Sequence, residues 1–310
     1  MTYLYLLAGE KIELAESELK GFLESQSLDE KPERNGKLCE TDAEPGQLKR
    51  LALTHEVSQK KTEIPNEDLE DFSPESKPES SFAVRSENLS GEENRKDPEK
   101  ILGEKFSGED NTVDLENPET VIKAYILDEK IIIGHLVQDI DRGLFEKRKN
   151  HNRPFSSPVS MDPVLARVLV NLSGIKPGKD LLDPFCGTGG ILIEAGLCGI
   201  GVCGTDMKEE MVEGCRENLE EYGIISHDIR KNNASQSLEI FDTEFSAIVT
   251  DLPYGKSSKT TESAVEDFLE LIENFDSRSV FMYNEEEIGE YSSDFRVYVH
   301  KNLTRHIFIV

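Results

Sequence analysis

The chain has 310 residues and a formal net charge of −27 at pH 7. Its length favours two domains, each large enough to enclose its own core, and no apolar stretch is long enough to cross a bilayer. Its five cysteines include no C-x-x-C pair, which argues against both a zinc site and a disulfide framework. We therefore expect a cytoplasmic protein without a metal, whose thiols are buried and reduced.

The acidity weighs against a nucleic-acid partner, because the contact faces of such binders are usually basic. Net charge reflects solubility rather than fold, so local clusters matter more. The denser basic cluster contains Lys147, Arg148, Lys149, His151 and Arg153, and a looser one contains His300, Lys301, Arg305 and His306. The denser cluster fits a nucleic-acid contact and a solvated linker equally well.

The N-terminal half mixes predicted strands with polar segments. Residues 1–25 predict a strand and an amphipathic helix, since they lack the basic region and cleavage site of a signal peptide. Residues 26–50 and 58–81 are rich in Glu, Lys, Ser and Pro and predict loops or disordered segments. Gln47–Val57 predicts a short helix, and residues 86–100 form another polar stretch.

Four more strands are predicted in this half from short apolar runs bounded by turn residues. They cover Ser81–Arg85, Thr112–Leu115, Val121–Leu127 and Lys130–Gly134. Asp128 and Glu129 would form a hairpin turn between the last two. These elements indicate an α+β region.

From Met161 onward, predicted strands and helices alternate, beginning with a helix after Asp162-Pro163. The strands are Asp180–Asp183, Gly201–Asp206, Ile224–Ile229, Phe245–Asp251 and Ser279–Tyr283. The helices between them are Gly190–Gly196, Lys208–Tyr222 and Glu262–Phe275, and the chain closes with a hairpin of Phe295–Val299 and His306–Val310. This pattern predicts an α/β, Rossmann-like fold with a seven-stranded, mostly parallel sheet and a terminal antiparallel hairpin.

Three predicted strands end in an acid: Asp183, Asp206 and Asp251. Ligands of parallel sheets bind at these carboxyl ends. Asp183 opens a glycine-rich turn over Asp183–Gly190, whose glycines allow a ligand close to the backbone, although its spacing is not G-x-G-x-x-G. Asp206 can accept both hydrogen bonds of a ribose diol, as in sites for NAD or S-adenosylmethionine; capping the helix from Lys208 is the alternative.

The loop Asp251-Leu252-Pro253-Tyr254-Gly255 directly follows an apolar strand. The Asp251 carboxylate and the backbone carbonyl of Leu252 or Pro253 can hold the two N–H groups of a nucleobase amino group, which aims its lone pair at a methyl donor. Asp251 would also stabilise charge developing on that nitrogen, and Tyr254 offers a ring for stacking. Together with the glycine-rich turn, this loop predicts methyl transfer from S-adenosylmethionine to a base nitrogen. An ordinary strand-to-turn transition is the alternative.

Several stretches resemble the archaeal tRNA (guanine-10-N2)-dimethyltransferases and their eukaryotic monomethylating relatives. In the C-terminal half these are Arg153–Phe155, Met161–Pro163, Asp183–Gly190, Thr250–Gly255 and His300–Arg305. In the N-terminal half they are Arg50–Val57, Phe82–Arg85 and Val113–Pro118, which look like parts of the family's THUMP-containing region. The resemblance covers nearly the whole chain and is weakest in the polar stretches between residues 26 and 112.

The resemblance implies a ferredoxin-like/THUMP region over residues 1–135 that binds tRNA, a linker over 136–158 and a methyltransferase domain over 159–310. It implies mono- and dimethylation of the N2 atom of guanosine-10. Asp251, Pro253 and Tyr254 would then be catalytic. The cofactor would contact Asp183, Phe185, Gly187, Thr188, Gly189, Asp206 and either Asp228 or Asn233. Some relatives need a small activating partner protein, and the sequence leaves this requirement open.

This chain departs from the family pattern at two places. Leu252 replaces the usual proline after the catalytic acid, which keeps the backbone carbonyl but reduces the rigidity of the loop. Asn232-Asn233-Ala234 replaces Gly-Asp-Ala, so that Asn233 can accept from the adenine amino group without a charge. Because guanosine-10 is paired in a stem, its base must be flipped out. Phe155 and Tyr254 are candidates to stack on it, and Phe155 fits interdomain packing equally well.

Three other functions remain open at this stage. The target could be another guanine, or an adenine N6, in tRNA or rRNA, because both amino groups suit the same loop. A non-catalytic RNA-binding factor is a second alternative, against which the intact Asp251, Pro253 and Tyr254 argue. An NAD(P)-dependent oxidoreductase shares the glycine-rich turn and Asp206 but has no use for the loop after Asp251.

Overall fold

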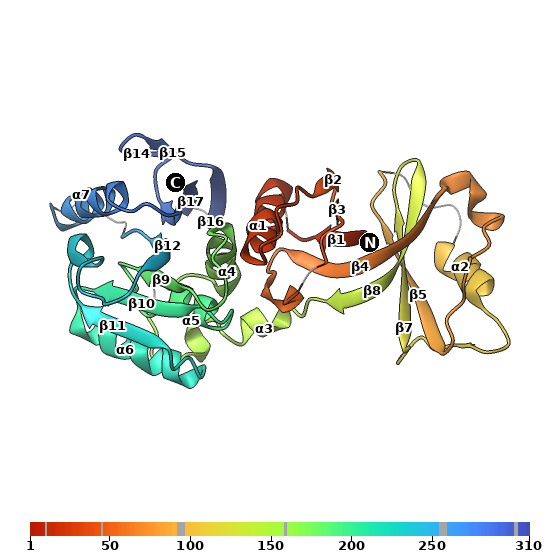
Figure 1. Ribbon diagram of the computed structural model, residues 1–310, viewed down its shortest axis with the longest axis horizontal. Coiled ribbons are helices and arrows are strands. Elements are labelled where there is room, and N and C mark those ends of the chain that lie inside the picture. The colour runs from red at the N-terminus through yellow and green to blue at the C-terminus, as the bar shows by residue number, and fades with distance from the viewer. Residues whose placement is uncertain (10, 45, 92–96, 158–159, 254–258, 301–302) are drawn as a thin grey trace. The chain divides into compact units, whose positions relative to one another are not determined.

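The computed structural model describes the chain except for residues 10, 45, 92–96, 158–159, 254–258 and 301–302. The chain forms two compact units (Figure 1). The N-terminal unit contains residues 1–16, 30–48 and 54–140, and the C-terminal unit contains residues 17–29, 49–53 and 141–310. Residues 17–29 and 49–53 lie in the region expected to form the N-terminal domain (1–135), but they belong to the C-terminal unit. No helix in the described ranges is long and apolar enough to span a bilayer.

The N-terminal unit is built on an eight-stranded sheet in the order β2-β3-β1-β4-β8-β7-β5-β6. Its strands are β1 (Tyr3–Leu7), β2 (Glu33–Asn35), β3 (Leu38–Thr41), β4 (Thr54–Pro65), β5 (Ser81–Asn88), β6 (Thr112–Val113), β7 (Thr120–Ile126) and β8 (Lys130–Asp139). The predicted turn at Asp128 and Glu129 is confirmed, because the Leu127 amide donates to the Lys130 carbonyl (2.9 Å). Long strands β4 and β8 pair antiparallel (Figure 1).

The prediction of loops or disorder over residues 26–50 and 58–81 is wrong in part. Strands β2 and β3 lie in the first segment, and β4 extends through residue 65 in the second. Strand β4 is polar, and it pairs with β1 on one side and β8 on the other. Backbone hydrogen bonds and the ion pairs of Lys60 with Glu40 and Glu63 thus stabilise a strand that has little apolar periodicity.

Two helices of the N-terminal half also differ from the prediction. The expected helix over Gln47–Val57 is only a short 3-10 turn, η1 (Leu48–Arg50), before β4 begins. Helix α2 (Pro98–Phe106) starts inside the polar stretch 86–100, and the side chain of Asp97 caps it by accepting from the Lys100 amide (3.2 Å). Its buried Leu102 and Phe106 join a core with Phe82.

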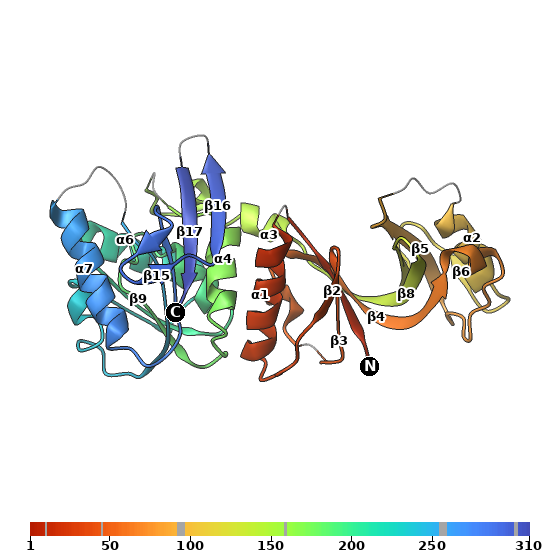
Figure 2. The same cartoon turned by 90° about the horizontal axis from the view of Figure 1, so that it is seen from above.

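The C-terminal unit has a seven-stranded sheet in the order β11-β10-β9-β12-β13-β17-β16. The strands are β9 (Asp180–Asp183), β10 (Gly201–Asp206), β11 (His227–Lys231), β12 (Phe245–Asp251), β13 (Ser279–Tyr283), β16 (Phe295–His300) and β17 (Leu303–Ile309). Strands β9 to β13 run parallel, whereas β17 is antiparallel to β13. Strands β16 and β17 form an antiparallel hairpin (Figure 2). The predicted fold class is confirmed, including the terminal hairpin.

Helix α4 (Pro163–Leu172) precedes the first parallel strand, as the sequence predicts. The helices that connect parallel strands are also as predicted, and they are α5 (Gly190–Gly196), α6 (Glu209–Glu221) and α7 (Lys259–Glu273). Helix α5 contacts β9 and β10, and α6 contacts β10 and β11 (Figure 1). Between the sheet and α7 lies an aromatic core in which Phe281 stacks on Phe308 and contacts Phe268 edge-on, at 4.8 and 4.9 Å between ring centroids. A small hairpin, β14 (Glu287–Ile288) and β15 (Tyr291–Ser292), was not predicted.

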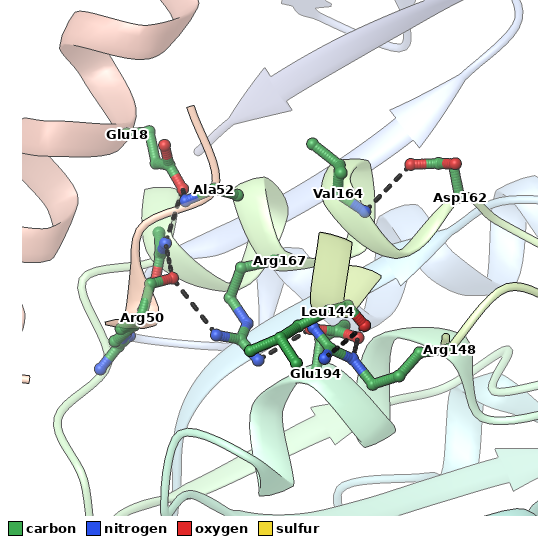
Figure 3. A network of polar contacts seen from close by, with 10 residues as sticks. Glu18, Arg50, Ala52, Leu144, Arg148, Asp162, Val164, Arg167 and Glu194 are labelled. Carbon is green, nitrogen blue, oxygen red and sulfur yellow. Dashed lines mark hydrogen bonds and ion pairs between the residues drawn. The ribbon is translucent and has the colours of Figure 1, made fainter. Parts of the chain in front are cut away.

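A buried polar network holds residues 17–29 and 49–53 in the C-terminal unit (Figure 3). Glu18, on helix α1 (Ile12–Ser25), is fully buried and accepts from the amides of Ala52 and Leu53 and from Asn171 Nδ2, at 2.7–2.8 Å. Arg50 Nε donates to Asn171 Oδ1 (2.7 Å). Helix α4, which carries Asn171, is therefore fixed to chain segments more than 100 residues away.

The same network continues to Glu194 of α5, which is fully buried (Figure 3). Its carboxylate accepts from Arg148 Nε (2.6 Å) and Nη2 (3.1 Å) and pairs with Arg167 Nη2 (2.7 Å). Arg167 also donates to the Arg50 carbonyl. Arg148 of the denser basic cluster is therefore engaged inside the unit, as is the buried Arg153. Because the side chains of Arg148 and Arg153 are largely buried, these two residues fit neither of the two expected roles, a nucleic-acid contact or a solvated linker.

Candidate functional site

A cavity of about 570 Å³ opens at the carboxyl ends of β9, β10 and β12. Its volume lies in the range of small-molecule and cofactor sites. Of the residues predicted from the sequence, those that line it are Asp183, Phe185, Gly187, Thr188, Asp206, Asn233, Asp251 and Pro253. Gly189 and Asp228 are not among its lining residues, and Tyr254 lies outside the described residues. The topology thus gathers acids and a glycine-rich turn that are far apart in the sequence.

The glycine-rich turn between β9 and α5 needs its glycines for conformation and for space. Gly187 and Gly189 have φ values of +50° and +81°, in the left-handed region that glycine favours. A Cβ atom on Gly189 would lie 2.7 Å from Cys215 Sγ on α6. Gly189 therefore allows the turn to pack against α6, which differs from the predicted contact with the cofactor, while Gly187 faces the cavity.

Asp183 is buried at the end of β9, with only 2% of its surface exposed. One oxygen, Oδ1, accepts from both the Thr250 hydroxyl (2.6 Å) and the Phe185 amide (3.1 Å). Burial raises the pKa of this carboxyl to about 7, and the charge of Asp206 adds to the rise, whereas the two hydrogen bonds oppose it. The site thus contains a carboxyl group that titrates near neutral pH.

Asp206 ends β10 at the rim of the cavity. Its Oδ1 accepts from the Lys208 amide (2.8 Å), one residue before α6 begins, so part of the alternative capping role is observed. Its second oxygen, Oδ2, accepts no hydrogen bond within the described ranges. That oxygen is available to a ligand hydroxyl in the cavity.

The structure places Asn233, and not Asp228, at the cavity. Asp228 lies in the middle part of β11, is half-exposed and pairs with Arg230. Asn233 precedes the 3-10 turn η4 (Ala234–Gln236), and its Nδ2 donates to Asp267 Oδ2 on α7 (3.0 Å). Asp267 also lines the cavity and was missed from the sequence, because the helical spacing of α7 alone does not reveal which polar residue faces β-strand ends.

Asp251 lies at the end of β12 with Leu252 and Pro253, and all three line the cavity. The side chain of Asp251 is 23% exposed and forms an ion pair with the buried Arg305 of β17. Arg305 Nη2 also lies 3.4 Å from the Leu252 carbonyl oxygen, and burial lowers the pKa of Arg305 to about 10. The sequence placed Arg305 in a loose basic cluster, and only the pairing of β13 with β17 brings it to Asp251.

Phe155 lies against helix α6. A Cβ atom on Gly214 would come within 2.0 Å of its ring, and its amide donates to Asn218 Oδ1 (2.9 Å). Phe155 is not among the residues that line the cavity. Phe155 therefore packs inside the C-terminal unit, which fits the structure better than stacking on a base but differs from the expected interdomain packing.

Comparisons with known proteins show the family of the chain. Residues 150–287 match the family "RMKL-like, methyltransferase domain". The tRNA (guanine(10)-N2)-dimethyltransferase of Methanothermobacter thermautotrophicus is 40% identical over 270 residues, which cover 84% of this chain and 80% of the relative. The enzyme of that name from Methanocaldococcus jannaschii is 31% identical over 98% of both chains. The chain belongs to the tRNA (guanine(10)-N2)-dimethyltransferase family.

A solved structure supports the fold over the whole length. TrmN from Thermus thermophilus aligns with 100% of this chain and 99% of its own, with a TM-score of 0.56 and 20% identity. The family membership makes the chain a methyltransferase of the S-adenosylmethionine-dependent class. The cavity fits this cofactor, because a glycine-rich turn and the free Asp206 oxygen line adjacent strand ends where an adenosyl group and its ribose diol would bind.

Proposed function

We propose that this enzyme methylates the exocyclic N2 atom of guanosine-10 in tRNA, giving N2-methyl- and N2,N2-dimethylguanosine. The observation that carries the proposal is the position of Asp251 and the Leu252 carbonyl at the cavity end of β12. Relatives that align with most of this chain bear the name of this activity.

The residues at the end of β12 would prepare a weak nucleophile. The amino nitrogen of guanine is unreactive because its lone pair is delocalised into the ring. Asp251 and the backbone carbonyl of Leu252 or Pro253 offer acceptors for its N–H groups, which would direct the lone pair out of the ring plane. Bound S-adenosylmethionine supplies the electrophilic methyl group. The negative charge of Asp251 would stabilise the positive charge that develops on nitrogen as the N–C bond forms and the methyl–sulfur bond breaks. That charge is lost when the methylated nitrogen releases a proton to Asp251 or to water.

The base must leave its stem to reach this cavity, at a cost of a few kcal/mol. We propose that the N-terminal unit is the THUMP-containing region of the family and that its contacts with tRNA offset this cost. Pro253 lines the cavity beside Asp251 and would contact the flipped base. Tyr254, the predicted stacking partner, lies outside the described residues. The five cysteines are free and buried, which supports a reducing, cytoplasmic compartment.

The test uses labelled S-adenosylmethionine and unmodified tRNA transcripts that carry guanosine or adenosine at position 10. We expect incorporation only with guanosine-10 and recovery of N2-methylated guanosines after digestion. Equal incorporation into both transcripts would move the target to another nucleoside. If neither transcript were methylated, the assay would be repeated with a small activating partner protein, and persistent inactivity would favour the non-catalytic RNA-binding alternative.

A further inference from the structure

The side chains of Asn233 and Asp267 form a fixed pair on the wall of the cavity. Asn233 Nδ2 donates to Asp267 Oδ2 at 3.0 Å, and both residues line the cavity. Asn233 Oδ1 accepts no hydrogen bond from any residue within the described ranges. Because Nδ2 is bound to the Asp267 carboxylate, Oδ1 is the end of the Asn233 amide that stays available to a ligand.

The backbone around Asn233 is also held in place. Its amide donates to Asn232 Oδ1 (2.9 Å), and its carbonyl accepts from the Gln236 amide (3.2 Å) and the Ser237 hydroxyl (3.3 Å). Asp267 comes from helix α7, which packs against the turn η4 that follows Asn233. Since both backbones are fixed, the remaining freedom of the pair is the rotation of the Asn233 amide.

This rotation matters for recognising a purine. A free asparagine side chain can present either its oxygen or its NH₂ group with nearly the same shape. The 6-amino group of adenine donates hydrogen bonds, whereas the 6-oxo group of hypoxanthine accepts them. An unrestrained amide could satisfy both bases by turning over. An amide bound through Nδ2 to a carboxylate can accept only from the amino group, because turning over would break a charge-assisted hydrogen bond.

We propose that Asp267 is a positioning residue that locks the Asn233 amide with Oδ1 available to the cofactor, so that the site selects an amino-substituted purine over an oxo-substituted one. The inference rests on the assignment of this cavity as the S-adenosylmethionine site. It explains how a neutral asparagine can serve where the family carries an aspartate, since an aspartate has no donor end and needs no lock.

The test is the binding of S-adenosylhomocysteine and S-inosylhomocysteine to the full chain, measured by calorimetry. The wild-type chain should prefer the adenine compound. Asp267→Ala should lower this preference by about tenfold, because the freed amide can then donate to the 6-oxo group. A merely structural role for Asp267 predicts instead that both affinities fall by the same factor, and that result overturns the proposal.

A second pair of variants tests the lock by loss and rescue of cofactor binding. Asn233→Asp should weaken binding in the wild-type background, because two carboxylates would then face each other. Adding Asp267→Ala to Asn233→Asp should restore both the affinity and the adenine preference. Failure of this rescue, with folding confirmed by an unchanged melting temperature, contradicts the lock. If the wild-type chain bound neither compound, both the cofactor site and the proposed function would be contradicted. If Asp267→Ala bound S-adenosylhomocysteine normally and kept the adenine preference, only the role of Asp267 would be contradicted.

Discussion

The buried guanidinium of Arg305 forms an ion pair with the carboxylate of Asp251, and its Nη2 lies 3.4 Å from the carbonyl oxygen of Leu252. These are two of the acceptors that would hold the guanine amino group. Arg305 comes from β17, next to β13, whereas Asp251 ends β12 and Leu252 follows it. The terminal antiparallel strand therefore contributes to the orientation of the groups that we propose to be catalytic.

Replacing Arg305 by methionine should slow methyl transfer without weakening cofactor binding. The carboxylate of Asp251 would lose its partner and its fixed orientation, and a misplacement of about 1 Å costs on the order of 100-fold in rate. Single-turnover rates and calorimetric titration with S-adenosylhomocysteine would separate the two effects. Equal loss of rate and of cofactor affinity would show that Arg305 supports the whole site rather than Asp251.

The strength of this ion pair can be measured in a double-mutant cycle. Urea unfolding of Arg305→Met, Asp251→Asn and the double variant should give a coupling free energy of about 1–3 kcal/mol, as expected for partly buried groups in direct contact. A second cycle with Arg278→Met, Glu24→Gln and their double variant is the matched control, because the Arg278–Glu24 pair is far more exposed and should contribute little. A coupling as small as that of the control would contradict a structural role for the Arg305 pair.

The roles of Asp251 and Asp206 should separate cleanly. Asp251→Ala should lower the rate of methyl transfer by about 100-fold or more and leave S-adenosylhomocysteine affinity largely intact. Asp206→Ala should instead weaken cofactor binding, because its free oxygen is placed for the ribose diol. Both variants are measured by the same calorimetric and single-turnover assays. Loss of cofactor binding in Asp251→Ala would mean that Asp251 contacts the cofactor rather than the base.

Asp183 should make the protein less stable as the pH rises. Its pKa is about 7 in the folded chain against an ordinary value of 3.8, so between these values the folded state keeps a proton that the unfolded state releases. The free energy of unfolding should therefore fall between about pH 4 and pH 7, by up to about 4 kcal/mol from this group. Asp183→Asn can keep both hydrogen bonds to Oδ1, and it removes the contribution of this carboxyl group to the pH dependence of the free energy of unfolding. The difference between variant and wild type should grow with pH in urea unfolding, and a constant difference would contradict the raised pKa.

The buried network around Glu194 should be sensitive to the loss of its carboxylate. Glu194→Ala leaves Arg148 and Arg167 without their acid partner, and breaking such a buried pair costs about 3–5 kcal/mol. Glu146→Ala, which removes an exposed partner of Lys149, should leave the free energy of unfolding nearly unchanged. Chemical unfolding of both variants tests the contrast. Similar small losses would show that water replaces Glu194 at no cost.

The sequence predicted the C-terminal unit more closely than the N-terminal one. Strands β9, β10, β12 and β13 have the predicted bounds because short apolar runs there end at an acid or just before a polar residue. Strand β4 was missed because its residues are polar and its stability comes from pairing with β1 and β8. Local pattern carries no information about such pairing, since the partners of β4 lie far away in the sequence.

Among the residues of the site, the sequence by itself determined the acids at strand ends and the glycine-rich turn. Chain direction in a parallel sheet brings all strand ends to one edge, so Asp183, Asp206 and Asp251 had to meet. Only the tertiary structure decided what surrounds them. It placed Asn233 rather than Asp228 at the cavity, put Asp267 beside it and brought Arg305 to Asp251. These contacts depend on the packing of α7 against η4 and on the antiparallel pairing of β17 with β13. No local sequence pattern encodes the distances that this packing sets.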